Sequence, residues 1–143
     1  MHDENERQFA AHDQFARGIA YISSQDGAYQ ANLEKAMTCF QAALDLYSLE
    51  RVPADWAKAQ QTLGMTYRKL FLGSRQKYLN KALAALQASL EVYTREFYPR
   101  EWACTQYEMA LTYVSLLPTN RKVYLLKAIS CLQACLDIYT YEA

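Results

Sequence analysis

The chain contains few of the residues that interrupt helices, with 4 glycines and 3 prolines among its 143 residues. So few breakers favour helices over β-sheet. It also lacks an excess of charge, since 15 Lys and Arg balance 15 Asp and Glu. A net charge of zero removes the overall attraction that nucleic-acid and anionic-membrane binders carry. Apolar residues make up 52% of the chain, which excludes disorder and fits one folded domain.

An apolar leader is missing as well, because the chain begins Met-His-Asp-Glu-Asn-Glu-Arg. No run reaches the roughly 18 consecutive apolar residues that a membrane-spanning helix requires. We therefore expect a cytoplasmic protein with no membrane partner. In that compartment the four cysteines should be reduced thiols and not disulfides.

The sequence repeats with a period of 46 residues. The matching positions include the Lys-Ala pairs at 35–36, 81–82 and 127–128 and the tyrosines at 47, 93 and 139. Such a period indicates a repeat protein, in which each unit packs on the next. We predict a single domain over 1–143, with repeats at about 10–55, 56–101 and 102–143.

Each repeat contains two helical patterns separated by a polar break. The second half of repeat two has apolar residues at 79, 82, 83, 86, 90 and 93, the spacing of one helix face. The first halves carry a small residue inside the helix, such as Gly64, which indicates a close helix crossing. Pro53 and Pro99 suit first helical turns, and Ser74 and Asn120 suit N-caps. The sequence therefore predicts an all-α chain of six antiparallel helices.

The second-helix pattern resembles the tetratricopeptide repeat. Its Ala, large apolar and small residues match Ala36, Phe40 and Ala43, and they recur in the other two repeats. The resemblance implies a right-handed α-solenoid of three helix-turn-helix repeats. The unit is 12 residues longer than the 34 of the family, and it is similar to the long repeats of bacterial arrays beside caspase-like peptidase domains and of kinesin light chains.

The resemblance also implies a binding groove lined by the first helices. Its lining residues would recur at four positions in each repeat: His12, Phe15, Ile19 and Ile22; Lys58, Gln61, Met65 and Arg68; Cys104, Tyr107, Leu111 and Val114. This wall is apolar at both ends and basic in the middle. A peptide or amphipathic helix with an acidic centre would suit it.

Neither catalysis nor metal binding is expected, and no cofactor is predicted. His12 and Cys104 lie two repeats apart, which is too far for a catalytic dyad. Cys131 and Cys135 are one helical turn apart but have no histidine nearby to complete a zinc site. We interpret them as small thiols at a helix crossing.

These patterns indicate a non-catalytic scaffold for a protein or peptide partner. The alternative is a regulatory module of, or partner to, a caspase-like peptidase, and a nucleic-acid-binding helical repeat is disfavoured. The last helix has no capping helix after it in this sequence, and repeat alignment places Cys131, Cys135 and Ile138 on its outer face. We expect these residues to be exposed, with a modifiable Cys135, and to mediate homo-oligomerisation or to meet a continuation of the chain.

Overall fold

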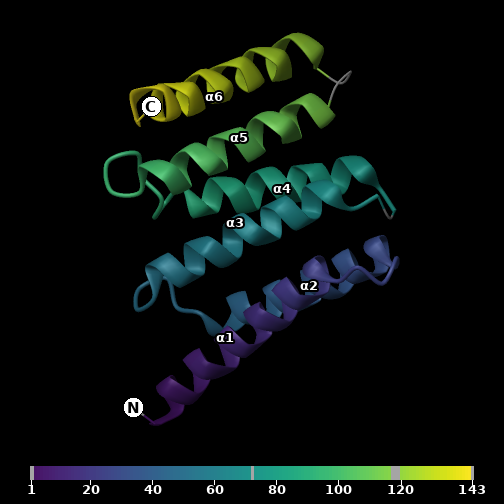
Figure 1. Ribbon diagram of the computed structural model, residues 1–143, viewed down its shortest axis with the longest axis vertical. Helices are drawn as coiled ribbons and strands as arrows, with labels where there is room; N and C mark the ends of the chain where they lie inside the picture. The colour runs from purple at the N-terminus through teal and green to yellow at the C-terminus, as the bar shows by residue number, and fades with distance from the viewer. Residues whose placement is uncertain (1, 72, 117–119, 143) are drawn as a thin grey trace.

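The computed structural model describes residues 2–71, 73–116 and 120–142, and within them it contains six helices and no strand. This confirms the all-α prediction and the number of helices. The helices are α1 (His2–Ser23), α2 (Tyr29–Leu46), α3 (Pro53–Lys69), α4 (Arg75–Ser89), α5 (Pro99–Ser115) and α6 (Arg121–Glu142). They follow one another along the longest axis of the molecule (Figure 1).

The helices start where the sequence predicts. Pro53 and Pro99 are the first residues of α3 and α5, where a proline costs no hydrogen bond. Ser74 caps α4, since its hydroxyl accepts a hydrogen bond from the backbone N–H of Lys77. Asn120 directly precedes α6 with a φ of 47°, a left-handed conformation that asparagine tolerates better than most residues.

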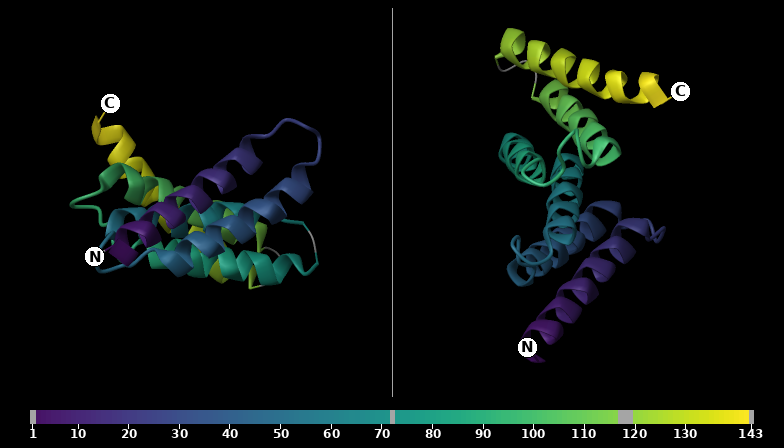
Figure 2. Two further views of the ribbon diagram at one scale, coloured as in Figure 1. Left: turned by 90° about the horizontal axis from the view of Figure 1, so that it is seen from below. Right: turned by 90° about the vertical axis from the view of Figure 1, so that its left-hand side faces the viewer.

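Consecutive helices pack against each other in pairs. The most extensive contacts join α1 to α2, α3 to α4 and α5 to α6, and smaller ones join α2 to α3 and α4 to α5. A few contacts also link α3 directly to α5. Helices α1 and α6 lie at opposite ends of the molecule (Figures 1 and 2).

Small residues allow the close approach within each pair. A Cβ atom built on Gly18 would lie 2.4 Å from the ring of Phe40, and one built on Gly64 would lie 2.7 Å from Cγ of Leu86. Both distances are shorter than any tolerated carbon contact. The close crossing predicted at Gly64 is therefore confirmed.

A lysine lies over a tyrosine ring at equivalent places in all three pairs. The ammonium group is 5.6 to 5.8 Å from the ring centroid, within the range of a cation–π interaction. The pairs are Lys35 with Tyr21, Lys81 with Tyr67, and Lys127 with Tyr113. The period of 46 residues in the sequence is thus also a period in side-chain contacts.

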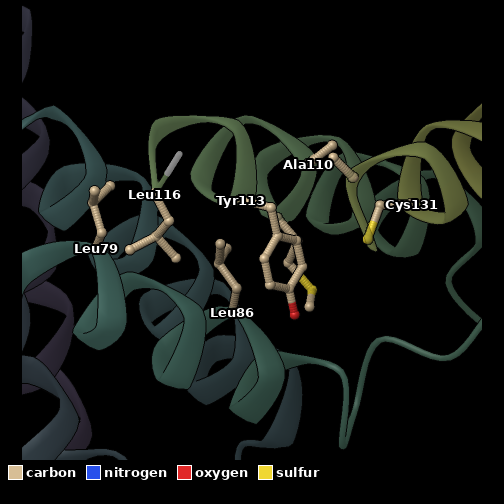
Figure 3. Packing of buried hydrophobic residues seen from close by; sticks show 8 residues of the cluster. Leu79, Leu86, Ala110, Tyr113, Leu116 and Cys131 are labelled. Atoms are coloured by element: carbon tan, nitrogen blue, oxygen red, sulfur yellow. The ribbon is translucent and has the colours of Figure 1, made fainter. Parts of the chain in front are cut away.

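The core between successive pairs uses the apolar stripe of the second helix. On α4, Leu79 and Leu86 are 1% and 0% exposed and pack in one cluster with Tyr113 of α5 and with Leu116, which directly follows that helix. Figure 3 shows these side chains together, with Cys131 of α6 beyond the tyrosine ring. The stripe of α2 packs similarly, since Leu33 and Phe40 share a cluster with Leu63 and Tyr67 of α3 and with Leu70, which directly follows α3.

Helix α6 differs from the others in composition. Over Arg121–Thr140 its mean hydropathy is 1.2, and by length and composition this is the only described helix that could cross a membrane. The segment is not an uninterrupted apolar run, because Lys127 and Asp137 divide it. Only 17% of this apolar part of α6 is buried inside the molecule.

Candidate partner-binding surface

The twelve residues predicted to line a groove lie at four equivalent positions on α1, α3 and α5, and we refer to them as the groove face. Every one of these residues is at least partly accessible. They are His12, Phe15, Ile19, Ile22, Lys58, Gln61, Met65, Arg68, Cys104, Tyr107, Leu111 and Val114. Side-chain contacts along this face connect α3 to both of the other helices.

At the α1 end the groove face is apolar but partly used for packing. Phe15 and Ile19 are half-buried against the core around Phe40. The centroids of the Phe15 and Phe40 rings are 5.4 Å apart. The ammonium group of Lys58 lies 5.8 Å from the ring of Phe15 and links α3 to α1. This end therefore presents the outer edges of core side chains and one lysine.

His12 takes part in a structural contact. Its Nδ1 atom is 2.8 Å from the hydroxyl of Tyr47, and its Nε2 atom is 3.9 Å from a carboxylate oxygen of Asp55 on α3. Burial, together with the nearby charge of Asp55, raises the pKa of Tyr47 to about 12. The phenol thus stays protonated at neutral pH, and His12 helps to join α1, α2 and α3.

Polar contacts link α3 to α5 in the middle of the face. Gln61 donates to the hydroxyl of Thr105 at 2.8 Å and to the carbonyl of Glu101 at 3.2 Å. Arg68 donates through Nε and Nη2 to one oxygen of Glu108, each at 3.0 Å.

The ion pair alters the expected charge of the groove face. The side chains of Arg68 and Glu108 are only 18% and 8% exposed, so the carboxylate neutralises a cation that was expected to face a partner. Of the two basic residues predicted at the centre of the groove face, only Lys58 then keeps a charge that no carboxylate of α5 neutralises. Glu108 was not identified from the sequence, although it replaces Ala16 and Thr62 of the other repeats, and that departure was a usable signal.

The α5 end is the most open part. Tyr107 and Val114 are 45% and 49% exposed, and Leu111 between them is half-buried. Nearer the other end of the face, Ile22 and Met65 line a pocket between α1, α2 and α3. The face therefore offers an aromatic and aliphatic surface at α5 and a recess near the end of α1.

The expected exposed face at Cys131, Cys135 and Ile138 is wrong. These side chains are 8%, 6% and 9% exposed. Cys131 packs with Tyr113, and the other two pack with Ala103, both on α5. Burial raises the pKa of the Cys131 and Cys135 thiols, which also argues against a reactive Cys135.

Other apolar residues of α6 are exposed. Seven large ones have exposed fractions between 38% and 60%. They are Val123, Leu125, Leu126, Ile129, Leu132, Leu136 and Tyr139. The last helix thus has an exposed apolar surface, as predicted, but other residues form it than the three that were predicted.

Three of the cations around α3 and α4, Arg68, Arg75 and Lys81, have partners within the chain. The Arg75 guanidinium donates to the carbonyl groups of Arg68 and Leu70 and lies 4.0 Å from the ring of Phe71. Lys81 lies over Tyr67 and Tyr78. Contacts of this kind do not favour a nucleic-acid surface, which would present its cations to phosphates.

In the described part of the chain, no three His, Cys, Asp or Glu side chains are grouped closely enough to hold a metal ion. Comparisons with protein-family models, with curated proteins and with solved structures find no match for this chain. The features of this chain that bear on its function are the groove face and the exposed apolar residues of α6.

Proposed function

We propose that the chain is a three-repeat right-handed α-solenoid of the tetratricopeptide type and that it acts as a non-catalytic scaffold. Its groove face would bind a segment of another protein. The observation that supports this proposal best is that α1, α3 and α5 present the same four positions at accessible places, with α3 linked to both neighbours by side-chain contacts.

The repeated contacts support the solenoid. The lysine–tyrosine contact recurs in all three pairs, and the small-residue crossing of Gly18 recurs at Gly64. Repeats with the same internal contacts, joined by similar contacts between neighbours, stack into a superhelix with an extended surface.

The chemistry of the groove face defines the segment that would fit. Tyr107 and Val114 provide apolar contact area at α5, and an exposed tyrosine is a frequent source of binding energy. Lys58 is the accessible cation of the central helix on this face, since Arg68 is paired. We infer a segment with apolar side chains toward both ends and a carboxylate near Lys58.

Affinity capture with variants tests this function. Tagged wild-type protein, Tyr107→Ala and Phe97→Ala would each be used to capture partners from an extract of the source cells, with identification by mass spectrometry. Phe97 is 75% exposed in the connection between α4 and α5 and serves as a matched aromatic control. Binding at the groove face predicts a partner that the wild type and Phe97→Ala both capture. Tyr107→Ala should bind that partner at least about fivefold more weakly. Equal retention by all three proteins would place the binding site elsewhere.

A further inference from the structure

The exposed stripe of α6 has the spacing of a helix-pairing surface. Leu125, Ile129, Leu132, Leu136 and Tyr139 follow one another at intervals of four, three, four and three residues, and we refer to them as the α6 seam. This is the alternation of a and d positions over two heptads, which a single partner helix can cover. Leu136 and Leu125 are 60% and 43% exposed.

Equivalent seams are covered elsewhere in the same molecule. The residues that precede Leu125 by 92 and 46 positions are Leu33 and Leu79, which are 2% and 1% exposed. Leu132 is 38% exposed, whereas its equivalents Phe40 and Leu86 are fully buried. In those repeats the seam packs against the first helix of its own pair, at Gly18 and Gly64, and also against the next helix along the chain, α3 or α5. The α6 seam therefore has the composition of a buried helix interface.

Helix α1 of another copy does not suit this place. The positions with which α3 covers α2 include Ala59 and Leu63, and their equivalents on α1 are Asp13 and Arg17. These two form an ion pair of 3.2 Å with both side chains at least half exposed. Docking α1 on the α6 seam would desolvate both charges against leucines, which is costly. Head-to-tail stacking of copies is thereby disfavoured.

We propose that the α6 seam binds the α6 seam of a second copy, in an antiparallel and two-fold symmetric dimer. In one antiparallel register Ile129 faces Leu132 of the second copy and Leu125 faces its Leu136. Each a position then meets a d position. A two-fold axis makes the same patch serve both subunits.

Charge favours the antiparallel direction. The amino-terminal half of α6 carries Arg121, Lys122 and Lys127, whereas Asp137 is the charged residue between 128 and 140. An antiparallel pair places each basic half beside the other helix's Asp137 and the negative end of its dipole. A parallel pair would place the two basic halves together.

The available area is sufficient. The five side chains of the α6 seam and the adjoining Leu126 together expose on the order of 600 Å² per subunit, at about 200 Å² for a large side chain. Their complete burial in a symmetric pair would remove about 1,200 Å² from water, which is the lower end of the range of specific interfaces. A monomer that left this stripe in water would carry a patch at the upper end of what monomeric proteins expose.

Sedimentation velocity of the intact chain over a hundredfold range of concentration tests the dimer. We expect twice the 16.5 kDa monomer mass at the highest concentrations. Leu136→Glu should raise the dissociation constant at least about tenfold, whereas Leu49→Glu, at an exposed leucine between α2 and α3, should leave it unchanged. A monomeric wild type, or a dimer that persists in Leu136→Glu, would overturn the proposal.

Disulfide trapping tests the direction of the helices and does not depend on a charged substitution. Leu125→Cys and Leu136→Cys proteins carrying tags of different size would be mixed and oxidised, with the wild type as the control for the native thiols. The antiparallel register predicts mixed disulfides in excess over disulfides between identical variants. An excess of disulfides between identical variants would refute it. A wild type that stays monomeric and sediments with anionic lipid vesicles would assign the seam to a membrane surface instead.

Discussion

Replacing Gly64 with alanine tests whether the helix crossing between α3 and α4 is as close as the structure shows. The new Cβ atom would lie 2.7 Å from Cγ of Leu86 and 3.2 Å from the backbone carbonyl oxygen of Ala82. Leu86 is fully buried and its Cγ is the branch point of the side chain, so relief requires a shift of the helix or of the core.

Two effects oppose each other in this variant. Overpacking a core costs about 1 to 3 kcal/mol, and a contact at a branch point favours the upper part of that range. Alanine is better than glycine inside a helix by about 1 kcal/mol. We therefore expect Gly64→Ala to lower the free energy of unfolding by about 1 to 2 kcal/mol.

Urea denaturation followed by circular dichroism measures this change. A loss of that size should lower the midpoint by about 0.5 to 1 M. Ala110→Gly is the matched control, because the third repeat already has a methyl group at the equivalent position and buries it. It should lose about 1 kcal/mol of helix propensity and about 0.8 kcal/mol for the buried methyl group, so a methyl group at this position stabilises the third repeat. A Gly64→Ala protein more stable than the wild type would refute the close crossing.

Further predictions concern buried polar groups. Glu108→Ala leaves the largely buried Arg68 without its counter-charge and should lower the free energy of unfolding by about 2 kcal/mol in urea, whereas Arg68→Leu combined with Glu108→Leu should recover most of it. Cys135 in the folded protein should react with a thiol reagent at least about tenfold more slowly than in urea, because burial limits access and raises its pKa; equal rates would mean that α6 leaves α5 readily. Burial raises the pKa of Tyr47 and Tyr93 from 10.0 to about 12. Their contribution to stability is therefore complete below pH 10 and is lost as the pH rises toward 12, and urea midpoints at several pH values should fall less steeply when both are changed to phenylalanine.

Much of the fold follows from local sequence. Proline at 53 and 99 fixes the starts of α3 and α5, since a first-turn residue needs no backbone donor, and Ser74 caps α4 through its own hydroxyl. The 46-residue period marks Gly64 as a crossing, because a glycine inside a strong helical pattern is otherwise unfavourable. The helix starts depend on residues within a few positions of one another, and the crossing depends on a pattern that the sequence repeats, so sequence alone determines both.

Contacts between helices decided the properties of the two surfaces. Arg68 and Glu108 are forty residues apart and on different helices, so only the packing of α3 on α5 shows that the cation is neutralised. On α6 the stripe that contains Cys131 and the stripe that contains Leu132 are both apolar, and the sequence gives no polar face by which to tell the inner side from the outer. Helix α5 packs against the cysteine stripe, where small side chains permit close approach, and the leucine stripe is left in contact with water.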